Sequence, residues 1–222
     1  MDEITETKWK VLNRDTIKYI AMFTMLLNHI SKIFMESGNF VSEVFLNVGY
    51  FTAIIMCYFL VEGYQYTHSK KKYAYRLIIY ALISEIPYCL AFTENGVLAF
   101  CGLNMLFTLF ICFCVLFAVE RVKNTPLKVA SILILILLSL VSDWPLLAPI
   151  FTLLFIWGKD SKKKLKAAFV ISIILFGMFK FVGGIGRFPL NTNILYALGR
   201  IVGVTLAGIV IIYFYNGKRM ER

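Results

Sequence analysis

The chain has 222 residues, of which 59% are hydrophobic and 16% are charged, and its net charge is +10. Soluble domains carry about 25% charged residues, so this composition excludes an ordinary water-soluble domain and indicates a protein embedded in a bilayer. The basic residues stand in short clusters between long apolar runs, a pattern typical of the cytoplasmic loops of membrane proteins, and no nucleic-acid motif accompanies them. We therefore expect membrane lipid, and no nucleic acid, as a partner.

Long apolar runs follow one another along the chain. A membrane helix needs about 20 mostly apolar residues to cross about 30 Å of hydrocarbon. We therefore expect an all-α fold, a polytopic transmembrane helical bundle with about eight spans in a single domain over residues 1–222. The spans are predicted near 16–36, 44–66, 73–93, 103–119, 127–141, 145–157, 167–185 and 193–215. The fifth and sixth are short, so a shallow or re-entrant hairpin also fits residues 127–157.

Basic residues alternate between the segments that join these spans. One set of segments holds 18 of the 23 lysines and arginines, whereas segments 37–43, 94–102 and 142–144 hold none and 186–192 holds Arg187. The 18 residues are Lys8, Lys10, Arg14, Lys70, Lys71, Lys72, Arg76, Arg121, Lys123, Lys128, Lys159, Lys162, Lys163, Lys164, Lys166, Lys218, Arg219 and Arg222. The positive-inside rule places this set in the cytoplasm. The sequence thus predicts a multi-pass protein of a bacterial-type inner (cell) membrane, with cytoplasmic N and C termini.

Polar residues inside the predicted spans are the functional candidates. A charged side chain at a span's centre costs about 2.5–3.5 kcal/mol on insertion scales, so it persists where it faces protein or water. The set comprises Lys18, Asn28, His29, Glu62, Glu85, Asn104, Lys180 and Arg200, with Asp143 and Arg187 at the outer edge. Small residues at spacing four, Gly199, Gly203 and Ala207, predict close helix packing in the last span.

Depth along the spans sorts these residues into two layers. His29 lies about 20 Å from the cytoplasmic start of the first span at 1.5 Å per residue. Glu85 and Asn104, with Thr108, fall at comparable or shallower depth and share this layer near the outer side. The second layer, towards the cytoplasm, comprises Glu62, Arg76 and Lys18. His29 suits general acid–base work, and the alternative is a histidine hydrogen-bonded across helices. For the two glutamates, Glu62 and Glu85, the alternative is an ion pair with Arg76 or Lys180, or a role in helix packing.

Four sequence blocks follow one another along the chain: Ile20–Ile33 with Asn28-His29, Phe59–Tyr64 with Val61-Glu62-Gly63, Tyr73–Phe92 with Ala81–Pro87, and Asn104–Leu109. Together these blocks resemble the TraX family. The likeness covers about residues 12–157, and the later spans match in hydropathy. The family pattern has Asp before the histidine, where this chain has Asn28, and often Gly-Arg in place of Gly49-Tyr50.

The resemblance implies a chemistry, because the family is named for a conjugative-pilus protein that acetylates the N-terminus of pilin. It implies an integral membrane acetyltransferase with cytosolic acetyl-CoA as donor and a peptide or small molecule, through an amine or hydroxyl, as acceptor. The implied catalytic residues are His29 as general base, Asn28, Glu85, Asn104 and Thr108. The implied acetyl-CoA contacts are Lys18, Glu62, Lys72 and Arg76, and the substrate-side residues are Asp143 and Arg187.

Other interpretations remain open from the residues alone. A transporter or proton-coupled carrier also buries His, Glu and Arg in a bundle, although no pair of Gly/Pro-broken helices is visible. A membrane scaffold explains the hydropathy but leaves the costly polar residues unexplained. The five cysteines lack zinc-ligand spacing, so no metal is expected. The sequence leaves the acetyl acceptor and the oligomeric state open.

Overall fold

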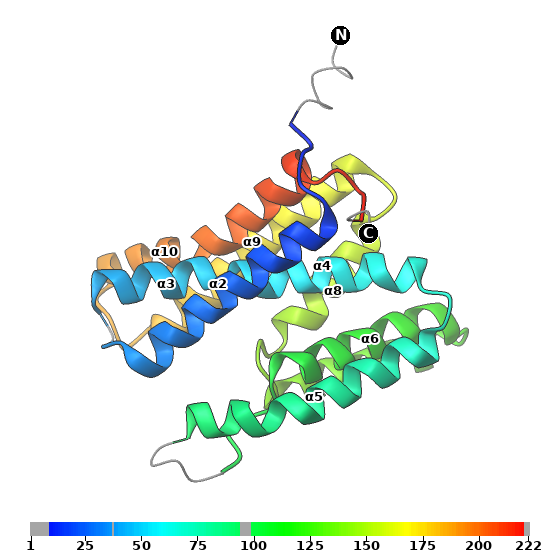
Figure 1. Cartoon of the computed structure of the whole chain (residues 1–222), viewed down its shortest axis with the longest axis horizontal. Helices are drawn as coiled ribbons and strands as arrows, with labels where there is room; N and C mark the ends of the chain where they lie inside the picture. Colours follow the sequence, from blue (N-terminus) through cyan, green and yellow to red (C-terminus); the bar gives the residue numbers. More distant parts are fainter. Residues whose placement is uncertain (1–8, 37, 94–98, 220–222) are drawn as a thin grey trace. The chain divides into compact units, whose positions relative to one another are not determined.

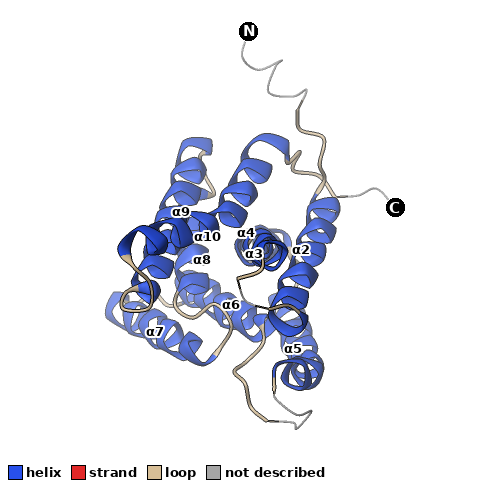
Figure 2. Ribbon diagram, turned by 90° about the vertical axis from the view of Figure 1, so that its left-hand side faces the viewer, coloured by secondary structure: helices blue, strands red, loops and turns tan. Residues whose placement is uncertain are grey.

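The computed structural model describes residues 9–36, 38–93 and 99–219. Lys8, Arg222 and residues 94–98 of the predicted outer segment 94–102 lie outside these ranges. The described residues fold into helices (Figures 1 and 2). These are α2 (Arg14–Phe34), α3 (Phe40–Gly49), α4 (Phe51–Tyr66), α5 (Lys70–Phe92), α6 (Met105–Arg121), α7 (Thr125–Leu138), α8 (Leu147–Gly158), α9 (Lys162–Gly184) and α10 (Leu190–Ile209). The predicted all-α fold is confirmed.

Short polar residues fix where many of these helices begin. The side chains of Asn13, Asn39, Ser69, Asn104 and Asn124 each accept a hydrogen bond from a backbone N–H in the first turn of the following helix. Such N-caps satisfy donors that the helix itself leaves without an acceptor. Two short helices directly continue longer ones. The 3₁₀ helix η2 (Ser139–Val141) follows α7, and the π-helix η3 (Val210–Phe214) follows α10.

Every predicted span falls on a helix or on two consecutive helices. The span predicted at 44–66 covers α3 and α4, which are separated at Tyr50. The largest difference at a helix start is at α9, which begins at Lys162 where the span was predicted from 167. The reason is that the helix continues through the basic residues 162–166, whereas the hydropathy measure counts the apolar run alone.

Four helical stretches are long and apolar enough to cross a membrane. They are Phe40–Tyr66, Lys70–Phe92, Lys162–Gly184 and Leu190–Phe214. The stretches Thr125–Val141 and Leu147–Gly158 are apolar but shorter. At 21 residues α2 is long enough, but it carries charged residues such as Lys18 and Lys32. The number of crossings therefore stays a prediction, and so does the hairpin alternative for 127–157.

Contacts divide the chain into two compact units. Unit 1 comprises Met1–Ile55 and Gly158–Arg222, and unit 2 comprises Met56–Trp157, so α4 begins in unit 1 and continues in unit 2. In unit 1, α2 packs on α3, and α10 packs on both α3 and α9. In unit 2, α6 packs on α5 and on α7. The single-domain expectation stays a prediction.

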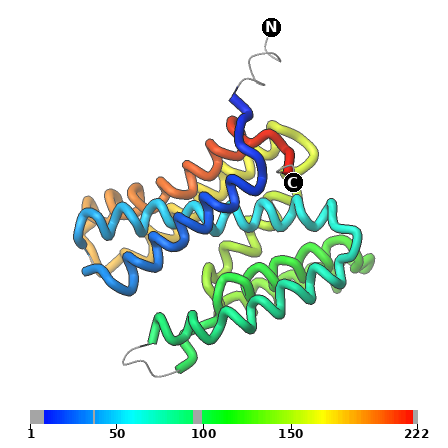
Figure 3. Tube along the Cα trace, in the orientation of Figure 1, coloured from blue at the N-terminus to red at the C-terminus, as the bar shows by residue number. Residues whose placement is uncertain are grey.

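The two ends of the described chain lie side by side in unit 1 (Figure 3). The Leu12 N–H donates to the Phe214 carbonyl at 3.0 Å, and the Asn216 N–H donates to the Leu12 carbonyl at 3.0 Å. The Arg14 N–H donates to the Lys218 carbonyl at 2.9 Å. Since these bonds join the start of α2 to the end of η3, the chain returns to the end of unit 1 from which it started.

Candidate functional site

Arg200 of α10 is a buried charge in unit 1, with 3% of its surface exposed. Its Nη2 lies 3.0 Å from the Glu43 Oε2 on α3, and its Nη1 donates to the Asn47 Oδ1 at 3.0 Å. The guanidinium carbon lies 4.2 Å from the centroid of the Tyr196 ring. The guanidinium is thus held by an ion pair, an amide and an aromatic face, which together offset the cost of burying its charge.

Glycines bring α10 close enough to α3 for this contact. A Cβ added at Gly203 would lie 2.3 Å from the Asn47 carbonyl oxygen and 2.8 Å from the Phe51 backbone nitrogen. A Cβ added at Gly199 would lie 3.2 Å from the Asn47 Nδ2. Because both positions lack a side chain, the two backbones approach closely and Arg200 reaches Asn47. The close packing predicted from the small residues is confirmed at these two glycines.

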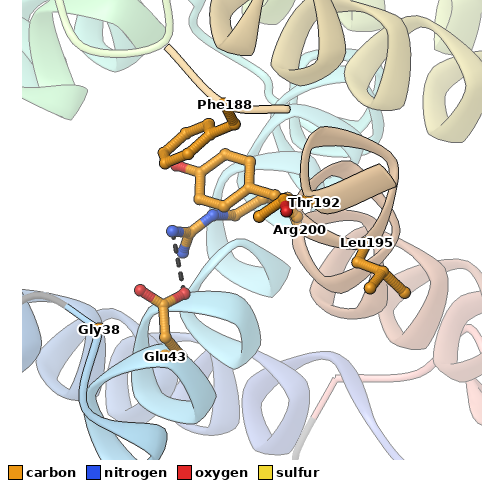
Figure 4. A pocket seen from close by; sticks show the side chains of 7 residues that line it. Gly38, Glu43, Phe188, Thr192, Leu195 and Arg200 are labelled. Carbon is orange, nitrogen blue, oxygen red and sulfur yellow. Dashed lines mark ion pairs between the residues drawn. The ribbon is translucent and has the colours of Figure 1, made fainter. Parts of the chain in front are cut away.

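The ion pair lines a pocket of about 530 Å³. Besides Glu43 and Arg200 the pocket is lined by Gly38, Phe188, Thr192, Leu195 and Tyr196. Figure 4 shows the Glu43 carboxylate and the Arg200 guanidinium pointing toward each other. The Glu43 side chain is 31% exposed and that of Arg200 is 3% exposed, so the carboxylate is the more accessible of the two charged groups.

Sequence reasoning found only part of this site. The sequence identifies Arg200 as a costly polar residue but does not identify Glu43 or Asn47. Glu43 stands one residue before the predicted span 44–66, so hydropathy assigns it to the preceding loop. The signal that would have found it is Asn39, whose side chain caps α3. A helix starting there places Glu43, Asn47 and Tyr50 on one face, because they are four and three residues apart.

Lys180 of α9 is a second cation of unit 1 at aromatic faces. Its Nζ lies 4.8 Å from the centroid of the Tyr50 ring and 5.3 Å from that of Phe176. The Tyr50 centroid also lies 5.9 Å from the guanidinium carbon of Arg200. Tyr50 therefore lies within cation–π range of two basic side chains.

His29 is half-buried on α2. Its Nδ1 lies 2.7 Å from the Met25 carbonyl oxygen, one turn earlier in the same helix. A carbonyl only accepts, so this contact assigns the proton of the neutral ring to Nδ1 and leaves the basic lone pair on Nε2. That tautomer is the one a general base acting through Nε2 requires.

The neighbouring residue, Asn28, is 7% exposed and ties α2 to α3. Its Nδ2 donates to the Leu46 carbonyl at 3.0 Å, and its Cβ lies where a side chain at Gly49 would collide. Asn28 therefore fixes the helix that carries His29.

Lys18 lies on the same helix, nearer its N-terminus, and is half-buried.

In unit 2 the structure brings Glu85 and Asn104 together. The Glu85 Oε2 accepts from the Asn104 Nδ2 at 2.7 Å and from its backbone N–H at 3.1 Å. The Asn104 Nδ2 also donates to the Ala81 carbonyl at 2.9 Å, while its Oδ1 caps α6. The amide is used completely, so the two residues join α5 to the start of α6.

Thr108 and Asp143 also meet in unit 2. The Thr108 hydroxyl donates to the Asp143 backbone carbonyl at 2.5 Å, and the Asp143 N–H donates to the Leu103 carbonyl at 2.8 Å. These bonds hold the turn before α8, in which Trp144 and Leu146 have φ values of 60° and 61°. Left-handed backbone at non-glycine residues is costly, and the surrounding contacts maintain it.

Three of the residues predicted to contact acetyl-CoA belong to unit 2, and they lie near the junction of α4 and α5. Lys72 and Arg76 are exposed on α5, and Glu62 is half-buried on α4. The structure places an ion pair near them that the sequence did not indicate, since the Lys70 Nζ lies 2.7 Å from the Glu120 Oε2. Hydrogen bonds from Lys70 and then from the Tyr64 hydroxyl lower the pKa of Glu120.

The predicted catalytic set comes from both units. His29 and Asn28 belong to unit 1, whereas Glu85, Asn104 and Thr108 belong to unit 2. Arg187, predicted on the substrate side, is exposed beside Phe188, which lines the pocket. Within the described ranges, no three His, Cys, Asp or Glu side chains gather as a metal site would require. The catalytic roles of these residues stay predictions.

Comparison with known proteins gives a family match over nearly the whole chain. The family model described as TraX protein matches residues 13–222, so the match extends past residues 12–157 into α9 and α10. The chain is also 28% identical, over 219 residues, to a Dichelobacter nodosus protein described as "Probable fimbrial assembly protein FimC, serogroup H1". That alignment covers 93% of this chain and 85% of the relative. No solved structure matches the chain significantly.

Proposed function

The chain belongs to the TraX family, and from this premise we propose that it is a multi-pass membrane acetyltransferase. It moves an acetyl group from cytosolic acetyl-CoA to an amine or hydroxyl acceptor at the outer face of the bacterial inner membrane. The family match over residues 13–222 carries the proposal. The relative's name points to fimbrial assembly, so the acceptor we propose is a surface-filament subunit or a small molecule that accompanies it.

The fold supports a multi-pass topology. Four helical stretches are long and apolar enough to cross the bilayer. Hydrogen bonds between Leu12 and residues 214 and 216 hold the two ends of the described chain next to each other. We propose that both ends lie on one side of the membrane, which requires an even number of crossings. The positive-inside rule then assigns that side to the cytoplasm.

His29 is the proposed general base. Its Nε2 takes the proton from the acceptor N–H or O–H as that atom attacks the thioester carbonyl of acetyl-CoA. The C–S bond then breaks, the acetyl group stays on the acceptor, and the coenzyme leaves as a thiolate that takes up a proton. Asn28 is a positioning residue, because it holds α2 against α3 at Leu46 and Gly49.

The other predicted residues are proposed to bind acetyl-CoA, to keep local structure in place or to contact the substrate. Basic side chains at Lys18, Lys72 and Arg76, with Glu62, are proposed to meet the nucleotide of acetyl-CoA, whose phosphates are anionic. Glu85, Asn104 and Thr108 hold the start of α6 and the turn at Asp143. We propose that these contacts keep the functional residues of unit 2 ordered, and we propose Asp143 and Arg187 as substrate-side residues.

The test uses the full chain purified in detergent and compares its two histidines. Acetyl-CoA is supplied with a primary amine, and both the released thiol and the acetylated amine are measured. His29→Ala should lower turnover at least about 100-fold, which is the usual contribution of a general base. His68→Ala removes the chain's other histidine, which lies in the loop before α5 and is exposed, and it should leave turnover unchanged.

Thermal unfolding midpoints establish that both variants fold. Equal turnover of the two histidine variants would refute the role of His29. An absence of acetyl transfer by the folded wild-type chain across amine and hydroxyl acceptors would refute the proposed activity itself.

A further inference from the structure

Two cysteines of unit 2 lie against each other where α5 ends and α6 is about to begin. Cys89 is in the last turn of α5, and Cys101 stands shortly before Asn104, the residue that caps α6. The Cys101 Sγ donates to the Cys89 Sγ at 3.7 Å, although the two residues are 12 positions apart in the sequence. Sulfur atoms at this distance are in van der Waals contact, so rotation of the two side chains can bring them within bonding distance.

Hydrogen bonds hold the backbone close to each cysteine. The Cys89 carbonyl accepts from the Thr93 N–H at 3.0 Å and from the Thr93 hydroxyl at 2.7 Å. Next to Cys101, Gly102 has a φ of 101°, and the Leu103 N–H donates to the carbonyl of residue 141 at 2.8 Å. Because other contacts fix the backbone on both sides, the fold itself keeps the two thiols together, and a bond between them needs little rearrangement of the chain.

The other three cysteines of the chain have different surroundings. Cys57 lies within α4, and Cys112 and Cys114 lie within α6. Cys57 and Cys112 are fully buried, as expected of cysteines that pack as small apolar side chains. Cys101 instead lies between helices and is partly exposed, so an oxidant in water can reach it.

The proposed topology places the Cys89–Cys101 pair on the outer side. Helix α5 is long and apolar enough to cross the membrane, and its N-terminal end carries the basic residues 70–72. The positive-inside rule assigns that end to the cytoplasm, so the end with Cys89 faces outward. Disulfides persist outside the cytoplasm and are rare inside it, where thiol reductants keep cysteines reduced.

The electrostatic surroundings favour a lasting disulfide over a reactive dithiol. Desolvation first, and then the hydrogen bond to Cys89, raise the pKa of the Cys101 thiol to about 11. In redox-active dithiols the thiol pKa is lowered instead, because a stabilised thiolate favours the reduced form. Since the thiolate of Cys101 is disfavoured, the reduced form gains no such stabilisation here.

We propose that Cys89 and Cys101 form a structural disulfide that ties the end of α5 to the segment before α6 at the outer face of the membrane. The more exposed Cys101 attacks the disulfide of a thiol–disulfide oxidoreductase, and Cys89 then attacks the mixed disulfide. One S–S bond forms in the chain and one breaks in the oxidoreductase, which takes up two electrons and two protons. The Glu85 Oε1 loses the Cys89 S–H donor at 3.6 Å, whereas Oε2 keeps its two hydrogen bonds from Asn104.

Differential alkylation of the full chain tests whether the bond exists. Membranes of a bacterial expression host are dissolved in denaturant with N-ethylmaleimide, then reduced, and the released thiols are labelled with iodoacetamide. In most chains Cys89 and Cys101 should carry the second label, and peptides from the unreduced sample should be linked through these two residues. Cys57, Cys112 and Cys114 should carry the first label. If most Cys89 and Cys101 carries the first label, or if either is linked to another cysteine, the proposal is overturned.

The thermal unfolding midpoint of the full chain in detergent tests the structural role. A phosphine reductant should lower the wild-type midpoint by about 5 °C or more, because the disulfide restricts the unfolded chain. Cys89→Ser and Cys101→Ser should already have the lower midpoint, and the reductant should not change it further. Cys114→Ser is the matched control, since Cys114 is half-buried on α6 of the same unit and should leave the response to reductant intact. A wild-type midpoint that ignores the reductant, or a shift that persists in Cys89→Ser, would overturn the proposal.

Neither measurement involves acetyl-CoA, so the disulfide and the proposed function fail separately. A linked pair in a chain without transferase activity would leave the disulfide standing and remove the acetyltransferase. Transfer that depends on His29 in a chain whose Cys89 and Cys101 stay reduced would do the opposite.

Discussion

The two units each contain an ion pair of similar length in a different environment. In unit 1 Arg200 and Glu43 are 3.0 Å apart with side chains 3% and 31% exposed. In unit 2 Lys70 and Glu120 are 2.7 Å apart with side chains 27% and 39% exposed. The shorter contact is the more solvated one. Since charges interact far more strongly where water is excluded, contact distance is a poor guide to what each pair contributes.

The surroundings of the two pairs also differ. The Lys70 ammonium lies 3.9 Å from the Tyr64 ring centroid, and the Tyr64 hydroxyl donates to Glu120, so this cluster closes on itself. Arg200 lines a pocket, and its Nε has no hydrogen-bond partner within the part of the chain that the structure describes. A cluster whose polar groups are all paired stabilises the fold, whereas a buried donor left without an acceptor lowers stability.

Breaking the buried pair should have the largest effect. Glu43→Ala leaves a guanidinium buried without its counter-ion, and we expect a loss of about 3 kcal/mol in the free energy of unfolding. The measurement is chemical or thermal unfolding of the full chain in detergent. The double variant Glu43→Leu with Arg200→Met removes both charges and should lose much less, as apolar replacement of buried pairs often does. A single variant as stable as the double one would contradict this.

A second change tests the close approach of α10 to α3. Gly203→Ala places a Cβ against the Asn47 and Phe51 backbones at 2.3 and 2.8 Å, so the helices must separate. Overpacking of this kind costs about 1–3 kcal/mol, measured by the same unfolding experiment. Gly183→Ala is the matched control on α9, where an added Cβ meets nothing within 4 Å. It should be neutral or slightly stabilising, and equal losses in both would refute the packing argument.

The sequence predicts the helices well because apolar runs and capping residues are local features. Each of the predicted spans overlaps a helix, and Asn104 and Asn124 mark helix starts that hydropathy alone places within two residues. The site is harder to predict, because Glu43 and Arg200 are 157 positions apart and meet only through the packing of α3 on α10. Depth counting places residues in layers across the membrane but does not say which helices are neighbours.

The unit 2 contacts show what depth counting can achieve. Glu85 and Asn104 were placed at similar depth and do meet, at 2.7 Å. The sequence suggests an ion pair with Lys180 or Arg76 as the alternative for Glu85, whereas the structure shows its carboxylate accepting hydrogen bonds from Asn104 and Cys89. The Asn104 side chain, which also caps α6, supplies a hydrogen-bond donor to the Glu85 carboxylate, so no basic residue is needed there.

Removing that amide should have an intermediate effect. Asn104→Ala deletes the cap of α6 and the bonds to Glu85 and Ala81, and we expect a loss of about 1–2 kcal/mol. Asn104→Asp is the informative comparison, because it keeps the cap but sets a second carboxylate against Glu85. It should therefore be no more stable than Asn104→Ala at neutral pH and should recover as the pH falls. Unchanged stability in both variants would show that the contact is dispensable.

The smallest effect is expected at the solvated pair, and it should depend on pH. The pKa of Glu120 is lowered by Lys70 first and by Tyr64 next. A carboxyl group whose pKa falls on folding stabilises the fold at pH values above its pKa in the unfolded chain, here 4.5. This contribution is lost as the pH falls through the lower pKa that the group has in the folded protein. Lys70→Ala should cost no more than about 1 kcal/mol at pH 7. The difference from wild type should shrink as the pH falls below 4.5 and vanish once the pH is below the folded pKa of Glu120. Lys71→Ala removes an exposed charge one position along and should show no such pH dependence, so a loss of the same size there would assign the effect to net charge and not to the ion pair.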